Sequence, residues 1–491
     1  MQTGSLNGRW TVVRTGEQYL AGLRDGRRVF YRGQLVEDVT RHPVLRVPCA
    51  HSAFLFDLQF DRELSPPLAV PEGRAGEAVC SLYQAPASRD ALLSRADLIE
   101  ATTKRSGAVF NIVKVIGSDA LFALKIVSAA LDRAKGTDYA ARVQAYHEKV
   151  SREDLATVVA QTDVKGDRSL RPQQQRDPDL YVRIKERRPD GIVVRGAKAH
   201  ITQAPVSDEI LVIPSRAMTE GAYAVAFAVP ANAPGLTMIC RPLLELEGAR
   251  HPLEGPRVLH HALVEALVIF EDVFVPWERV FLAGEAEFAG PLAHMFALWH
   301  RYTAISYRAA QADLIAALGL EIAEANGVAD RSHIRRDLVD LILFSQVQRM
   351  AARMAAFEHK VDGLTGICYP NPLYVNIGKL YSNTHYLSAI QALIDCAGGM
   401  AITAPSGDDF ANPDLRPLIE KYLAGNPQVS GEKRFKLFLM LRELVGLLGG
   451  LESVTMVHAE GSIEASVIEL LRNYDFAPSR ALVERLVEGL S

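Results

Sequence analysis

The chain has 491 residues, 48% of them hydrophobic and 23% charged, and its 54 basic and 58 acidic side chains leave a formal charge of -4. This length exceeds what one hydrophobic core usually serves and predicts two or three domains. The charge balance gives no basic excess for binding nucleic acid or an anionic membrane surface. The N-terminal residues lack the apolar core of a signal peptide, and no uninterrupted apolar run reaches the roughly 18 residues of a membrane helix.

The five cysteines stand far apart, at positions 49, 80, 240, 368 and 396. Their separation excludes a disulfide framework and the close cysteine pairs of a zinc site. Isolated cysteines suit a reducing compartment, so we expect a cytoplasmic protein.

The first third of the chain is predicted to be helical after an irregular start. Apolar residues recur at helical spacing from 94 to 133, where Gly107 and Gly117 are candidate interruptions, and another helix is expected over 139–155. The polar segment 163–179 contains Gly166, Pro172 and Pro178 and predicts a loop at a domain boundary.

Short β-type runs follow between about residues 181 and 281, and most are bounded by Gly, Pro or Asp. This pattern predicts an antiparallel β domain. The runs are 191–194, 209–213, 223–229, 236–240 and 266–270.

Long helical periods return from about residue 287 and predict a bundle. The clearest are 306–325, 332–361, 374–396 and 431–451, with Ser332 as an N-cap and Gly398-Gly399 ending the third helix. We therefore predict an α+β fold with a mainly helical N-terminal domain (1–157), a middle β domain (158–286) and a C-terminal helical bundle (287–491).

Two loops are candidates for holding a cofactor. The turn at 196–202 ends in Thr202, whose hydroxyl can donate to a ring nitrogen or carbonyl of a flat ligand, or can instead satisfy the local backbone. The loop Lys165-Gly166-Asp167-Arg168 can meet phosphate, with the Asp fixing the Arg, or can be a solvated turn.

Two further residues are candidates for acid–base chemistry. His300, followed by Arg301, stands in an apolar context and is either a catalytic histidine or a satisfied core histidine. Glu265 heads an apolar strand and is either a base with a raised pKa or an outward-facing residue. No GxGxxG after a first strand, Walker loop, HExxH or GxSxG is present, so Rossmann, P-loop, zincin and α/β-hydrolase enzymes have no support.

Taken together, these stretches resemble the flavin-dependent family shared by 4-hydroxyphenylacetate 3-monooxygenase and 4-hydroxybutyryl-CoA dehydratase. The matching residues run in order over nearly the whole chain: RTGEQYL at 14–20, LRDGRRV at 23–29, Asp163 with KGDR at 165–168, GIVVRGAKAH at 191–200, YAV at 223–225 with Phe227, FEDVFVP at 270–276, HR at 300–301 and AGGM at 397–400.

The resemblance implies an acyl-CoA dehydrogenase-like fold and a homotetramer, a dimer of dimers with FAD between subunits. It places Thr202, Gly461, Ser462 and the loop Lys165, Gly166, Asp167, Arg168 at the cofactor. It implies that His300, Glu265 and Arg301 are catalytic residues, and that Ile116, Ala120, Val159, Ser215 and Tyr307 line the substrate pocket.

The chain departs from both chemical branches of that family. The stretch with which the hydroxylases hold a phenol reads Ile116-Gly117-Ser118-Asp119-Ala120, and the histidine of that grip falls at Val159, so we expect a substrate other than a simple phenol held as a phenolate. The three cysteines that hold the dehydratase's four-iron cluster read Asn111, Val115 and Tyr307, and only its histidine, His300, remains. A cluster needs thiolates, so we expect no iron–sulfur cluster and no metal. A late glutamate of the dehydratase falls at Thr455, while Thr202 and Glu265 match.

Three functions follow from this pattern. The first is a monooxygenase that uses FADH2 from a separate flavin reductase and acts on a small organic molecule in a dry pocket formed by the apolar Ile116, Ala120 and Val159. The second is a cluster-free lyase or isomerase of an acyl thioester, with Glu265 or His300 as the base. The third is a flavin-binding paralogue without catalysis.

Overall fold

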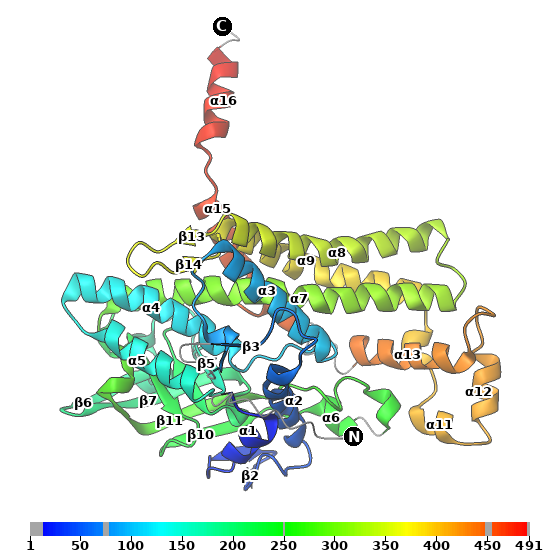
Figure 1. Ribbon diagram of the computed structural model, residues 1–491, viewed down its shortest axis with the longest axis horizontal. Helices are drawn as coiled ribbons and strands as arrows, with labels where there is room; N and C mark the ends of the chain where they lie inside the picture. Colours follow the sequence, from blue (N-terminus) through cyan, green and yellow to red (C-terminus); the bar gives the residue numbers. More distant parts are fainter. Residues whose placement is uncertain (1–12, 72–77, 249–250, 447–453, 489–491) are drawn as a thin grey trace.

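The computed structural model describes residues 13–71, 78–248, 251–446 and 454–488 (Figure 1). Its N-terminal part is mainly helical: α1 Gly16–Gly22, α2 Arg46–Asp57, α3 Arg89–Arg105, α4 Val115–Lys135 and α5 Tyr139–Arg152. The helical period over 94–133 is two helices, interrupted at 106–114 around the left-handed Gly107. Gly117 does not interrupt the helix but lies inside α4. A Cβ at this position would stand 1.7 Å from Thr157 Oγ1, so glycine is what allows the helix to pack closely against β5.

Two sheets form the centre of the molecule. The larger has the order β2-β1-β10-β11-β7-β6 and the smaller β12-β9-β8-β5. Their bounds are β1 Val29–Tyr31, β2 Gln34–Val36, β5 Thr157–Ala160, β6 Arg183–Arg188, β7 Gly191–Thr202, β8 Glu209–Val212, β9 Val225–Pro230, β10 Leu236–Cys240, β11 Glu265–Pro276 and β12 Val280–Ala283; short hairpins join β3 Ala69–Pro71 to β4 Ala78–Cys80 and β13 Lys360–Val361 to β14 Cys368–Tyr369.

Each predicted β run corresponds to a strand, and 236–240 matches β10 at both ends. Most pairs are antiparallel, as predicted, but β1 with β10 and β5 with β8 are parallel. The β1–β10 pair places an N-terminal strand beside the sheet of the middle segment. In the predicted loop at 163–179 the structure has two single 3-10 turns, Pro172–Gln174 and Pro178–Leu180, and an isolated β-bridge from Asp163 to Lys198.

Long helices lie side by side in the C-terminal part: α7 Ala286–Ala325, α8 Ser332–Phe357 and α9 Pro372–Ala397 (Figure 1). The α+β prediction is thus confirmed. Shorter helices are α6 Leu244–Gly248, α10 Met400–Thr403, α11 Gly407–Ala411, α12 Arg416–Tyr422, α13 Gly431–Val445, α15 Ile463–Asn473 and α16 Ala477–Glu488.

Three helix ends test the sequence signals. Gly398, with φ 67°, ends α9 as predicted. The Ser332 N-cap prediction is wrong: Arg331 has the cap position with extended φ and ψ, and Ser332 is the first helical residue. α13 ends at Val445, and the rest of the predicted helix over 431–451 includes residues outside the described ones. No described helix has the length and apolar character needed to cross a membrane.

Candidate functional site

A cavity of about 150 Å³ lies where the ends of β7 and β11 meet α7 and the segment 455–460. Four of the residues singled out from the sequence line it: Thr202, Glu265, His300 and Tyr307. The fold brings together two pairs that are far apart in the sequence. Glu265 pairs with Thr202 across β11 and β7, while His300 and Tyr307 share one side of α7 two turns apart.

Glu265 is paired in this cavity and not free. Its carboxylate accepts a short hydrogen bond from Arg241, which also donates to Glu245 at 2.6 Å. Burial raises the pKa of Glu265 above its ordinary value, and Arg241 opposes this shift only in part. Glu265 therefore holds a proton more readily than an exposed glutamate does.

His300 lies in the interior of α7, which begins at Ala286. Its ring stacks on Phe296 with centroids 5.4 Å apart. Its Nδ1 is buried and has no hydrogen-bond partner among the described residues. Burial lowers the pKa of His300 below its ordinary value, against the attraction of Glu460 and Asp119. The cavity therefore contains a neutral imidazole with an unpartnered nitrogen.

Glu460 is the cavity carboxylate that the sequence did not reveal. Tyr307 Oη donates to it at 2.8 Å and Arg308 Nη2 at 2.5 Å. Burial raises the pKa of Glu460, but Arg308, His300 and Lys379 outweigh burial and lower it overall. The late glutamate of the dehydratase was matched to Thr455, which lines the same cavity. Glu460 stands five residues after Thr455, in a turn where Glu460 and Gly461 have positive φ, a conformation that helical or strand periodicity does not reveal.

Buried cations hold this turn in place. Arg301 Nε donates to the Glu460 carbonyl at 3.0 Å and its Nη1 to Asn376 Oδ1 at 2.7 Å. Lys379 Nζ donates to the Gly461 carbonyl at 3.1 Å, and burial lowers the pKa of this lysine to about 7. Arg301 and Gly461 lie behind Glu460 and do not line the cavity. Ser462 accepts from the Ala465 N–H and caps α15.

The loop Lys165-Gly166-Asp167-Arg168 lies outside the cavity lining, and most of it is exposed. Asp167 accepts hydrogen bonds from the backbone and hydroxyl of Ser169, so the expected Asp167–Arg168 contact is replaced by a local turn. The nearby Ser215 donates to Asp163, which also pairs with the buried Lys198 at 2.7 Å. These contacts connect Asp163, two residues before the loop, to β7 of the large sheet and to the segment after β8 of the small sheet.

The apolar residues expected around the substrate are core residues. Ile116 and Ala120 are buried in α4, and Val159 packs against the same core from β5. None of the three lines the described cavity. Asp119, on the same helix, pairs with Arg95 of α3 at 2.7 Å and accepts from Thr303 of α7, so its carboxylate connects three helices.

The positions that resemble cluster ligands carry other contacts. Asn111 Nδ2 donates to the His51 carbonyl at 2.5 Å, and Tyr307 stacks on Phe110 with centroids 4.2 Å apart. Within the described ranges, no group of three or more His, Cys, Asp or Glu side chains could hold a metal ion.

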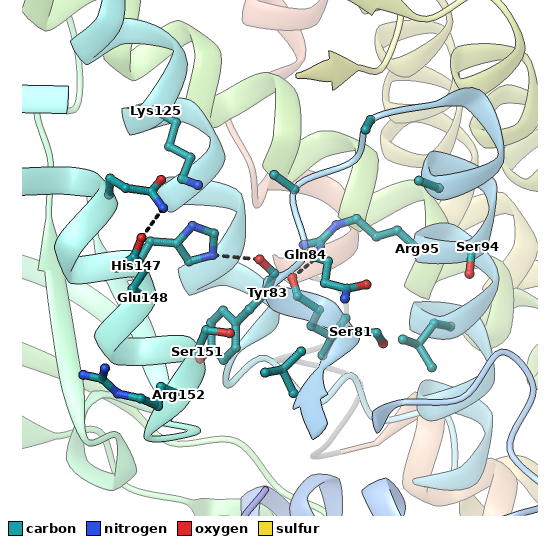
Figure 2. Close-up of a pocket in the computed structure, with 17 residues that line it drawn as sticks. Ser81, Tyr83, Gln84, Ser94, Arg95, Lys125, His147, Glu148, Ser151 and Arg152 are labelled. Carbon is teal, nitrogen blue, oxygen red and sulfur yellow. Dashed lines mark hydrogen bonds between the residues drawn. The ribbon is translucent and has the colours of Figure 1, made fainter. Parts of the chain in front are cut away.

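A larger groove of about 790 Å³ lies elsewhere, between α3 on one side and α4 and α5 on the other (Figure 2). Figure 2 shows Lys125, His147 and Arg152 facing Arg95 across it, and His147 Nε2 is 2.7 Å from the Tyr83 carbonyl. None of the residues predicted as catalytic or cofactor-binding lines this groove.

Comparison with known proteins places the chain in a family. Residues 15–282 match the family described as 4-hydroxyphenylacetate 3-hydroxylase N terminal, and 289–488 match its C-terminal counterpart. The chain is 29% identical to the 4-hydroxybutyryl-CoA dehydratase/vinylacetyl-CoA-Delta-isomerase of Clostridium aminobutyricum, over 97% of this chain and 99% of that protein. It is 29% identical to the oxygenase component of 4-hydroxyphenylacetate 3-monooxygenase from Thermus thermophilus, over 87% of each chain.

Solved structures agree over the full length. An oxygen-tolerant archaeal 4-hydroxybutyryl-CoA dehydratase from N. maritimus superposes with a TM-score of 0.90 at 26% identity, covering 97% of this chain and 95% of that one. The oxygenase component of 4-hydroxyphenylacetate 3-monooxygenase complexed with FAD superposes with a TM-score of 0.89 at 26% identity, covering 97% and 99%. The protein therefore has the acyl-CoA dehydrogenase-like fold and belongs to the 4-hydroxyphenylacetate 3-hydroxylase family.

Proposed function

We propose that the protein is the oxygenase component of a two-component monooxygenase that uses reduced FAD and acts on a small organic substrate other than a simple phenol held as a phenolate. The observation that carries this proposal is the neutral His300, whose buried Nδ1 has no partner among the described residues, in a cavity where Tyr307 stands at a cluster-ligand position in place of a thiol. Relatives that are monooxygenases support it, including the oxygenase component of a 4-nitrophenol monooxygenase from Rhodococcus opacus.

The residues present fit FAD. The Thr202 hydroxyl makes no hydrogen bond to a described residue and borders the cavity, so it is available to a flavin ring atom. Lys165 and Arg168 form no ion pair within the described ranges, so their charges can face the phosphates of FAD. Ser462 caps the N-terminus of α15, where backbone N–H groups can also bind phosphate. When bound in its reduced form, FAD would supply the electrons and the reaction with oxygen.

The chain's own residues would exclude water and move one proton. The stacked rings of Phe110 and Tyr307 close one side of the cavity. His300 would accept or donate a proton at Nδ1, since burial keeps its imidazole neutral. Glu460 holds Tyr307 and Arg308 through the hydrogen bonds described above, which fixes the shape of the site.

We also propose that a separate flavin reductase supplies the reduced FAD, because the sequence has no nicotinamide-binding fingerprint. We further propose that the protein is a homotetramer. The exposed side of α8 carries an apolar stripe: Val339, Ile342, Leu343, Met350, Met354 and Phe357. α16 projects from the body and has no buried residue (Figure 1). Apolar surface of this extent is typical of subunit contacts.

The test supplies photoreduced FAD without oxygen and then adds oxygen. Protein-dependent slowing of flavin reoxidation, with oxygenated product from a panel of small aromatic and aliphatic compounds, is the expected result. Reoxidation at the rate of free flavin would contradict the proposal.

A second candidate is a cluster-free lyase or isomerase of an acyl thioester. It is favoured by the raised pKa of Glu265, by its position opposite Thr202, and by the 29% identity to the dehydratase. Exchange of an acidic substrate proton with deuterium in the absence of oxygen would identify this activity, which the monooxygenase hypothesis does not predict.

A further inference from the structure

Two histidines meet at the wall of the same cavity. His51 is fully buried in α2, and His261 lines the cavity from the loop that precedes β11. Their Nδ1 atoms are 3.1 Å apart, and the other ring nitrogen of His51, Nε2, is 3.3 Å from the carbonyl oxygen of Phe110.

These contacts permit one arrangement of protons for two neutral rings. A carbonyl oxygen only accepts, so His51 must carry its proton on Nε2 and present a bare Nδ1. His261 must then donate from its own Nδ1. A neutral imidazole has one N–H, so Nε2 of His261 is left as a bare acceptor.

Burial keeps both rings neutral. It lowers the pKa of His51 to about 3 and that of His261 to about 4, with further lowering of His261 by His260 and Arg257. No described residue forms a hydrogen bond with His261 Nε2. Gln311 provides a second acceptor: it lines the cavity, and its buried Oε1 has no partner among the described residues.

From this geometry we infer that His261 Nε2 is a substrate-binding acceptor, fixed by His51, and that the cavity takes a neutral ring bearing an N–H or O–H donor. The inference depends on the proposed function in one respect: it takes this cavity to be the substrate-binding site. The lining favours a neutral ring over an anion, since the described residues around the cavity include one arginine, Arg257, which pairs with Glu443, and three further carboxylates, those of Glu245, Glu265 and Glu460.

Indole and benzofuran provide a matched pair of probes, because they share shape and size while one presents N–H and the other an oxygen acceptor. Their dissociation constants are measured on the FAD-loaded protein without reductant. Indole should bind about 2- to 10-fold more tightly, the worth of one neutral hydrogen bond. His261→Phe should abolish this preference. His51→Phe should reduce it, because His261 is then free to place its proton on Nε2.

Val258→Ala is the matched control: this apolar wall residue should weaken both probes equally. Equal binding, tighter benzofuran, no binding of either ring, or a preference that survives His261→Phe would overturn the assignment. A preference that survives His51→Phe would remove His51 from it; if that variant does not fold, the wild-type and His261→Phe comparison decides. Because no step in this test needs oxygen, a protein that prefers indole but fails to oxygenate would refute the proposed function alone.

Discussion

Replacing Glu460 with Gln tests how the cavity is held together. Glu460 and Arg308 form a pair with side-chain exposures of 3% and 0%, and the replacement keeps the shape while removing the charge. Arg308 keeps its bonds to the Thr455 carbonyl and Ser382 but loses its only carboxylate partner among the described residues. Breaking a buried pair from one side typically costs about 3–5 kcal/mol, because the remaining charge is uncompensated.

We expect the lower end, about 3 kcal/mol, since the Gln amide oxygen can still accept from Arg308 or Tyr307. The measurement is the free energy of unfolding by denaturant titration at one fixed protein concentration. Glu186→Gln, at an exposed pair with Arg188, is the control and should change stability little. Adding Arg308→Met to Glu460→Gln should restore most of the loss, as a double-mutant cycle. Unchanged or increased stability in Glu460→Gln would refute the reasoning and indicate that the carboxylate is kept for chemistry at a cost to folding.

Further outcomes are expected from the site and the surface. Protein purified without oxygen should contain no iron and no acid-labile sulfide; stoichiometric amounts of both would contradict the assignment of Asn111, Val115 and Tyr307. Thr202→Ala should weaken FAD binding by about 1 kcal/mol in a folded protein, and unchanged affinity would place this hydroxyl outside the cofactor site. Light scattering should give a tetramer whose flavin occupancy falls on dilution; a monomer that retains FAD tightly would oppose a shared site. His300→Gln should fold and bind FAD yet lose turnover by roughly 10²–10⁴-fold, releasing peroxide in place of product, and normal coupled turnover would make His300 a structural residue.

Periodicity revealed most elements because helix and strand patterns are local. The runs that became β7 and β11 were found but were too short, since bulges break the pairing of these two strands at 266–268 and 270–273. The start of α7 was missed because Gly290-Pro291 resembles a helix break; Pro291 lies in the second turn, and the long apolar helix behind it outweighs the one lost backbone bond.

The residues of the site likewise fall into those that the sequence identified and those that it did not. Thr202, Glu265, His300 and Tyr307 were identified by family motifs and do meet in one cavity. Glu460, Lys379 and the His51–His261 pair were not identified, because their roles depend on contacts between segments far apart in the sequence. The closest signal was the Glu460-Gly461 dipeptide, which resembles an ordinary turn. Ile116, Ala120 and Val159 were placed at the substrate by the family resemblance and by their apolar character, which core residues share.

The parallel pairing of β1 with β10 limits how the protein can be divided. Val29 and Phe30 are in register with Met238 and Ile239, so the edge of the large sheet is completed by a strand about two hundred residues upstream. A fragment that begins at residue 158 would expose an unpaired edge at β10, where Ile239 is already 43% exposed. Such a piece should self-associate through that edge. Limited proteolysis between α5 and β5 should correspondingly leave a nicked protein whose two pieces co-purify.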